Sequence, residues 1–293
     1  MIVLDGGIGR HLEKMGAPFG QPEWSALSLI QEPDFVLRAH KDFIDSGADV
    51  ITTNSYAIVP FHIGKDRFEK EGKDLLIRAG NIAKEAVKLY KREIKIAASI
   101  PPVLGSYKPD VFNSEKAIPI LEIFKNNLIQ FCDLILAETL SSIDEIKTIQ
   151  RVFGDCKIPF WISLTIEDEY YNIPKLRSGE EIVTALRKID FNKISSVLFN
   201  CSQPEVMTKA IKIAKNLVPE NTSLGVYANA FQPIKIGQRD ANSQIRNTRQ
   251  ELTPEKYFDF VKEWNELEVD IIGGCCGIGP EHIKKICELK KNR

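Results

Sequence analysis

The sequence predicts an α/β fold, a closed (β/α)8 TIM barrel of eight parallel strands and eight helices that occupies residues 1–293 as a single domain. Short apolar runs rich in β-branched residues alternate eight times with longer amphipathic segments. Such alternation is typical of a parallel sheet, and the even number favours closure into a barrel. An open, doubly wound sheet is the alternative, but its dinucleotide fingerprint is incomplete, because Leu12 stands where a third glycine should follow Gly7 and Gly9.

The expected strands are the short runs in which Val, Ile, Leu and Phe are frequent and which end in polar residues or glycine. They cover residues 2–5, 49–53, 94–99, 134–139, 160–165, 196–200, 224–229 and 269–273. Because each is followed by a loop and a helical pattern, we expect them to run parallel and in sequence order.

The expected helices have apolar residues at spacings of three and four. They cover residues 34–46, 69–92, 118–129, 143–153, 179–189, 204–217, 254–267 and 280–289. Proline near several starts fits the first helical turn, where its missing N–H costs nothing. The polar stretch 230–253 has no such pattern, so we expect a lid or specificity loop there.

The composition indicates a globular protein: 43% of the residues are hydrophobic and 27% charged, with a net charge of −1. This charge balance gives no overall attraction to nucleic acid or to an anionic membrane. No run approaches the ~18 apolar residues of a membrane helix, and no basic signal region precedes the first strand. We therefore expect a cytoplasmic protein with neither partner, and the sequence leaves its oligomeric state open.

Polar residues follow the ends of several predicted strands, where barrel enzymes carry their chemistry. Asp5, Gly6 and Gly7 follow the first strand, Thr53 ends the second, and Glu138 lies near the end of the fourth. A carboxylate that ends an apolar strand is costly to desolvate without a partner, which favours a functional role. The alternatives are a helix cap for Asp5, an ion pair for Glu138 and a turn or capping hydroxyl for Thr53.

Three cysteines give the most specific indication of a functional site. Cys201 follows the sixth strand, and the adjacent Cys275 and Cys276 follow the eighth, so one intervening strand separates them in a barrel. Three thiolates without histidine favour a tetrahedral zinc site with one open position. The alternatives are a phosphate-binding glycine-rich turn, a redox-active vicinal disulfide, or three structural thiols. Cys132, Cys156 and Cys287 stand in apolar or helical surroundings and are expected to be packing residues.

The chain resembles the zinc-dependent homocysteine S-methyltransferase family, which includes the S-methylmethionine– and betaine–homocysteine methyltransferases. The resemblance extends over essentially the whole chain, and the combination of Asn200-Cys201 with Gly273-Gly274-Cys275-Cys276-Gly277 is highly specific. It implies that Cys201, Cys275 and Cys276 bind Zn²⁺. It also implies that Asp5, Thr53 and Glu138 hold the amino-acid end of homocysteine.

The resemblance implies an enzyme that transfers a methyl group to the thiol of homocysteine and so forms methionine. An unperturbed thiol titrates near ~8.5, so binding to Zn²⁺ is needed to present it as a thiolate at pH 7. Glu138 is expected to pair with the substrate ammonium, and the backbone N–H groups of Gly6 and Gly7 to meet its carboxylate. S-Methylmethionine is the preferred donor, followed by S-adenosylmethionine or betaine. The alternative is a thiol-redox or zinc-binding barrel that acts on another thiol, such as cysteine or selenocysteine.

Overall fold

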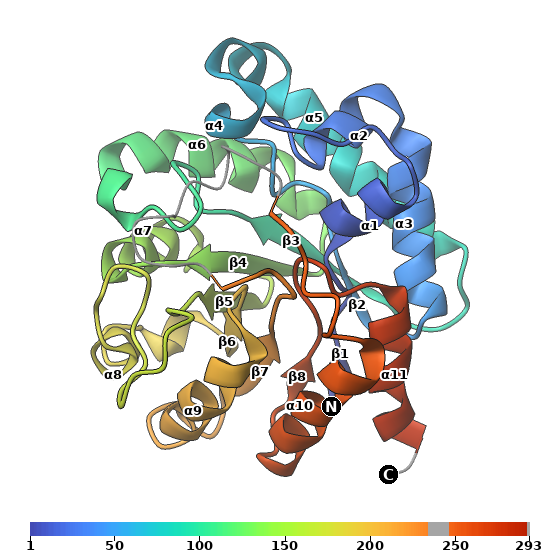
Figure 1. Cartoon of the computed structure of the whole chain (residues 1–293). Coiled ribbons are helices and arrows are strands. Elements are labelled where there is room, and N and C mark those ends of the chain that lie inside the picture. Colours follow the sequence, from blue (N-terminus) through green and yellow to red (C-terminus); the bar gives the residue numbers. More distant parts are fainter. Residues whose placement is uncertain (234–245, 292–293) are drawn as a thin grey trace.

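The computed structural model describes residues 1–233 and 246–291. In this part of the chain, eight parallel strands surround a common axis and helices pack outside them (Figure 1). The strands are β1 (Ile2–Val3), β2 (Val50–Thr52), β3 (Lys95–Ile100), β4 (Leu134–Leu140), β5 (Phe160–Leu164), β6 (Ser196–Asn200), β7 (Ser223–Tyr227) and β8 (Ile271–Ile272). The predicted parallel barrel is therefore confirmed.

Each strand pairs with its neighbours in sequence order from β2 to β8, and β8 pairs with β1. The joint between β1 and β2, where the barrel closes, has the fewest paired residues: Leu4 forms a single bridge with Val50. Two backbone hydrogen bonds support that bridge, from Asp49 N to Val3 O at 2.7 Å and from Asp5 N to Val50 O at 3.0 Å. Strands β1 and β8 are shorter than the predicted ranges 2–5 and 269–273. Strand β7 begins one residue before the predicted range 224–229 and ends two residues before its end, so Asn229 lies in the loop that follows.

Helices connect the strands and cover the outside of the barrel (Figure 1). They are α1 (Ile8–Lys14), α2 (Ala26–Gln31), α3 (Pro33–Asp45), α4 (Pro60–Ile63), α5 (Lys65–Lys88), α6 (Ser114–Asn127), α7 (Ile143–Phe153), α8 (Ile182–Leu186), α9 (Pro204–Ala214), α10 (Pro254–Glu266) and α11 (Pro280–Lys291). All eight predicted helices are present; α7 has the predicted bounds, and the others differ at one or both ends. Helices α1, α2 and α4 were not predicted, because elements this short hardly repeat an apolar face.

Helix α8 differs most from its predicted range of 179–189. The chain before it folds back on itself through bridges between Ile166 and Leu176 and between Lys175 and Glu181. The second bridge holds Glu181, in the first turn of the predicted helix, in an extended conformation, so α8 begins only at Ile182. As a result, the loop between β5 and α8 carries charged side chains back to the barrel mouth.

The hydrophobic core has two layers. Inside the barrel, buried side chains from all eight strand regions meet: Leu4, Val50, Ala97, Leu134, Leu136, Trp161, Leu198, Tyr227 and Ile271. A larger layer lies between the strands and the helices and includes Val3, Ile162 and Phe199. A packed interior leaves the loops at the carboxyl ends of the strands as the place for a site.

Among the described residues, no helix combines the length and the apolar character that a membrane span needs. Half of the predicted lid at 230–253, residues 234–245, lies outside the described residues.

Candidate active site and metal centre

One cavity at the carboxyl ends of the strands encloses about 910 Å³ of space, including the part that is open to solvent. Its lining includes every site residue expected from the sequence: Asp5, Gly6, Gly7, Thr53, Glu138, Cys201, Cys275 and Cys276. Aromatic side chains also line it: Trp24, Tyr56, Tyr107, Tyr227 and Phe231. A concave, largely apolar pocket with aromatic side chains and a few convergent polar groups is typical of a small-molecule site.

Three sulfur atoms meet in this cavity. The Sγ atoms of Cys201, Cys275 and Cys276 all lie within 4.8 Å of one another. The Cys201 and Cys275 sulfurs are 2.8 Å apart. Two thiolates on one tetrahedral zinc with ~2.3 Å bonds are separated by roughly 3.8 Å, so metal binding would open this pair by about 1 Å. The donor set and its compactness fit a soft divalent metal ion with a further position for an exogenous thiol.

Backbone contacts hold the cysteine loop after β8 against the loop after β7. Cys275 N donates to Ala228 O at 2.9 Å, and Ala230 N donates to Cys276 O at 2.8 Å. Gly273 N and Gly274 N donate to the carbonyls of Val226 and Asp5, at 3.1 and 3.0 Å. The amides of Gly273, Gly274 and Cys275 are therefore bonded within the fold and are not free for the phosphate that was the alternative interpretation of the glycine-rich turn.

All six cysteines are free thiols in this structure, including the adjacent pair of the vicinal-disulfide alternative. Cys201 is buried, and its backbone adopts a left-handed conformation with φ of 52°. Hydrogen bonds from the Cys275 and Cys276 sulfurs lower the pKa of the Cys201 thiol well below its usual range. The same contacts raise the pKa values of Cys275 and Cys276, because a thiolate at Cys201 favours protons on its neighbours.

Glu138 is the buried carboxylate closest to this chemistry. The register of β4 against β5 shifts between Ala137 and Leu140, and Thr139 has φ of 64°. The Glu138 carboxylate accepts hydrogen bonds from the hydroxyls of Ser99 and Tyr227. Burial raises its pKa to about 7. Among the described residues its partners are these hydroxyls and not a cation, so the ion-pair alternative is wrong.

Asp5 and Thr53 have internal partners as well as positions in the lining. The Asp5 carboxylate accepts hydrogen bonds from Thr52 N at 2.7 Å and from the Thr52 hydroxyl, which ties the joint between β1 and β2. Asp5 does not cap α1: the cap residue is Gly7, without a side-chain hydrogen bond, so the capping alternative is wrong. The Thr53 hydroxyl shares a hydrogen bond with Ser55 and accepts one from Ser99 N.

Gly6 and Gly7 lie where no side chain fits. A Cβ at Gly7 would be 2.5 Å from Cys275 O and 2.7 Å from Cys276 Cα, and one at Gly6 would be 2.2 Å from Ile278 O. The first loop therefore supports the metal-ligand loop by direct backbone packing. Gly7 N donates to Ile278 O at 2.9 Å, so this amide is used within the fold and is not free for a substrate carboxylate.

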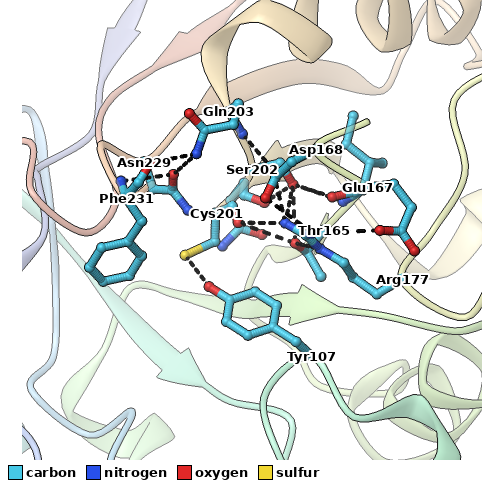
Figure 2. A network of polar contacts seen from close by, with 12 residues as sticks. Tyr107, Thr165, Glu167, Asp168, Arg177, Cys201, Ser202, Gln203, Asn229 and Phe231 are labelled. Atoms are coloured by element: carbon cyan, nitrogen blue, oxygen red, sulfur yellow. Dashed lines mark hydrogen bonds and ion pairs between the residues drawn. The ribbon is translucent and has the colours of Figure 1, made fainter. Parts of the chain in front are cut away.

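Sequence reasoning missed two parts of the site. Ser99 ends the third predicted strand and bonds to Glu138, so a complete survey of strand ends would have found it. A buried ion pair between Arg177 and Asp168 lies behind Cys201 (Figure 2). Asp168 follows the fifth strand closely, but the return of Arg177 to the same place depends on the fold of the loop before α8.

Three clustered thiols at the mouth of a parallel barrel define the kind of site that this protein carries. The family model described as homocysteine S-methyltransferase matches residues 2–289, so the chain belongs to the homocysteine S-methyltransferase family. It is a methyltransferase enzyme, as expected from the sequence.

Individual relatives are similar over nearly their full length. Homocysteine S-methyltransferase 1 of Brassica oleracea var. italica is 28% identical, over 99% of this chain and 94% of the relative. A selenocysteine methyltransferase of Astragalus bisulcatus is 27% identical, over 98% of this chain and 91% of the relative. The metallated form of the homocysteine methyltransferase MmuM from Escherichia coli has a TM-score of 0.81 at 21% identity, over 99% of this chain and 96% of that one. This last likeness supports the barrel fold.

Proposed function

We propose that the protein transfers a methyl group from a sulfonium donor, preferably S-methylmethionine, to the thiol of homocysteine and so forms methionine. The observation that carries the proposal is the meeting of three cysteine sulfurs and a buried carboxylate in one cavity. A thiol acceptor needs a soft metal at one end, and its ammonium group needs an anion at the other. This arrangement supplies both.

Cys201, Cys275 and Cys276 would hold Zn²⁺, and the family of the chain supports a metal at this place. When bound, Zn²⁺ lowers the pKa of a thiol at its fourth position and so supplies the acceptor as a thiolate at neutral pH. The three cysteine thiolates outweigh the charge of the dication. They therefore keep the acceptor sulfur rich in electrons, as a nucleophile requires.

The other residues bind and orient homocysteine. Glu138 would receive the substrate ammonium, which stabilises the ionised carboxylate that burial alone disfavours. Ser99 and Tyr227 hold that carboxylate in place through their hydroxyls. The amide of Gly6 would meet the substrate carboxylate, whereas Asp5 and Thr53 shape this end of the cavity and maintain the strand joint.

The donor would lie on the open side of the cavity, where Trp24, Tyr56 and Phe231 form part of the lining. Aromatic faces favour a cationic methyl group, and a sulfonium donor leaves as a neutral thioether after transfer. The sulfur–methyl bond of the donor breaks as the bond to the acceptor sulfur forms. Positioning of the two sulfurs and the methyl carbon in line is then the main task of the protein, and no acid or base is required.

Methionine formation from homocysteine tests this proposal with S-methylmethionine, S-adenosylmethionine and betaine as separate donors. We expect turnover with zinc-loaded, reduced protein, most rapid with S-methylmethionine, and loss of turnover on addition of a strong chelator. Absence of methionine with all three donors in a verified zinc-loaded sample would reject homocysteine methylation. In that case the thiol-redox interpretation would be tested next.

Selenocysteine is a second acceptor to include, because a relative of 27% identity is a selenocysteine methyltransferase. The same donors are offered with selenocysteine in place of homocysteine. We expect homocysteine to have the higher kcat/KM. A reversed preference would change the assignment of the acceptor and leave the metal site unchanged.

A further inference from the structure

Arg177 carries a buried charge next to the segment of Cys201 and Ser202 (Figure 2). It is 1% exposed. Its guanidinium forms a two-point ion pair with Asp168, at 3.1 and 3.2 Å, and Glu167 lies 3.7 Å away. A buried charge is retained only when it is paired and bonded on several sides, because desolvation costs several kcal/mol per ion. Such an arrangement is rigid.

Both members of the ion pair form hydrogen bonds to the segment that carries Cys201. Arg177 Nη2 donates to Cys201 O at 3.4 Å and to the Ser202 hydroxyl at 3.5 Å. The Asp168 carboxylate accepts from Gln203 N at 2.9 Å. Residues 201–203 are therefore bonded to both members of the pair, which holds the left-handed backbone of Cys201 in place.

Tyr107 connects the same ion pair to the cysteine sulfur. Its ring faces Arg177, with the guanidinium carbon 5.2 Å from the ring centroid. Its hydroxyl donates a hydrogen bond to Cys201 Sγ at 2.9 Å (Figure 2). Tyr107 is 5% exposed, and its own backbone has φ of 61°. Tyr107 and Cys201 are thus both buried, and both have a strained left-handed backbone. Such strain persists only where the surrounding structure holds the residue in place, so the geometry of their hydrogen bond is fixed by the fold.

We propose that Tyr107 is a positioning residue for the metal ligand Cys201, and that the Arg177–Asp168 pair holds both partners of the Tyr107–Cys201 hydrogen bond. The proposal rests on the metal-binding role of Cys201. A hydroxyl that donates to a ligating thiolate fixes the direction of the sulfur lone pairs and withdraws part of its charge. Arg177 then acts on the metal through Tyr107 and through the Cys201 carbonyl, without contact to the metal or the substrates.

The test compares Tyr107→Phe with Tyr56→Phe. Each change removes one tyrosine hydroxyl from the same cavity, but the Tyr56 hydroxyl bonds to Ser106 Oγ at 2.8 Å and not to sulfur. Zn²⁺ affinity is measured by competition with a chromophoric chelator. Removal of a partner of a metal ligand costs 10–100-fold in affinity in other sites, so we expect about 10-fold weaker binding for Tyr107→Phe. For Tyr56→Phe we expect Zn²⁺ affinity within two-fold of the parent.

The Co²⁺-substituted protein gives a second readout that loss of packing alone would not move. Loss of the hydrogen bond leaves the Cys201 thiolate more electron-rich, so the thiolate-to-Co²⁺ charge-transfer band is expected at longer wavelength in Tyr107→Phe. An unchanged band together with parental Zn²⁺ affinity would overturn the proposal. Failure of the parent protein to bind either metal would instead reject the proposed function.

The role of the ion pair is tested with the double variant Arg177→Met, Asp168→Asn. It removes Arg177 together with its nearest counter-charge, so that only the Glu167 carboxylate, 3.7 Å from Arg177, loses a cationic neighbour, and the asparagine oxygen can still accept from Gln203 N. We expect Zn²⁺ affinity to fall by a factor similar to that of Tyr107→Phe, and the triple variant with Tyr107→Phe to show little further loss. Additive losses would contradict a shared action through Tyr107.

Discussion

Four residues other than glycine that line the cavity adopt left-handed backbone conformations: Trp24, Tyr107, Thr139 and Cys201, with φ between 52° and 64°. Each such conformation costs roughly 1–3 kcal/mol and persists only where the surroundings define it. Here they belong to Cys201, to its hydroxyl partner Tyr107, to Thr139 beside Glu138 and to Trp24, all in the lining of one cavity. At the scale of single residues, strain is therefore concentrated at the site.

Glu138→Gln tests the proposed ammonium anchor. The amide keeps the shape of the side chain but loses its charge, and a hydrogen bond to a charged group contributes about 2 kcal/mol. We expect KM for homocysteine to rise about 30-fold, with a smaller effect on kcat, in steady-state assays. Glu145→Gln is the matched control, because Glu145 is also buried but belongs to the cap of α7. Equal KM values for the two variants would remove Glu138 from the homocysteine site.

Gly7→Ala tests the contact between the first loop and the metal-ligand loop. The new Cβ would meet the backbone of Cys275 and Cys276 at less than 3 Å, so the cysteine loop must move. We expect at least 10-fold weaker Zn²⁺ binding in a chelator competition. The control is Gly279→Ala, which lies near the same cysteines but has open space around its Cβ and should bind Zn²⁺ like the parent. Similar affinities for both variants would show that the cysteine loop does not depend on this contact.

At the scale of elements, one buried side chain links three strands behind the site. Asn200, the last residue of β6, accepts hydrogen bonds from Thr139 N in β4 at 3.0 Å and from the Ser163 hydroxyl in β5 at 2.8 Å. It also donates to the Thr139 hydroxyl at 2.9 Å. Because Glu138 and Cys201 are the direct neighbours of these residues, the carboxylate and the metal ligand are held at a fixed separation.

Helix α3 contains a histidine that makes the fold sensitive to acid. His40 is fully buried, neither ring nitrogen has a partner among the described residues, and burial lowers its pKa to about 4. The unfolded chain takes up this proton below about pH 6.5, so the free energy of unfolding falls as the pH drops from 6.5 to 4. The loss for His40 reaches about 3 kcal/mol.

His40→Leu removes this proton uptake and keeps an apolar side chain of similar size in place. We expect urea unfolding at pH 7 and at pH 4.5 to differ by about 2 kcal/mol less in the variant than in the parent. Burial lowers the pKa of His62 to about 4 as well. Part of the loss of stability at low pH should therefore remain in the His40→Leu variant. An identical dependence on pH in variant and parent would contradict the assignment.

The elements predicted from the sequence are those that rest on local patterns. The eight strands and their parallel order follow from the alternation of apolar runs and helices, and the three cysteines follow from their places after β6 and β8. Other features depend on contacts between distant loops. Tyr107 and Cys201 are 94 residues apart, and Arg177 reaches them only because the chain before α8 folds back. Short helices such as α1 also lack a periodic signal.

At the scale of the whole molecule, the barrel brings together residues that no single element could combine. Two of the three clustered cysteines come from the loop after β8, the third follows the end of β6, and β7 lies between these two strands. The Glu138 carboxylate comes from β4, across the mouth of the barrel. The Asp5 carboxylate closes the narrow joint between β1 and β2, so the lining of the cavity and the closure of the barrel share a residue.

The central claim is that three cysteines hold a metal ion that receives the acceptor thiol at its remaining position. X-ray absorption at the zinc edge measures it directly, because it counts the sulfur neighbours of the metal. We predict three sulfur ligands at ~2.3 Å in the zinc-loaded protein and four after homocysteine is added. We predict two in Cys275→Ala, whereas Cys132→Ala should match the parent. A sulfur count that does not rise with homocysteine would contradict the account.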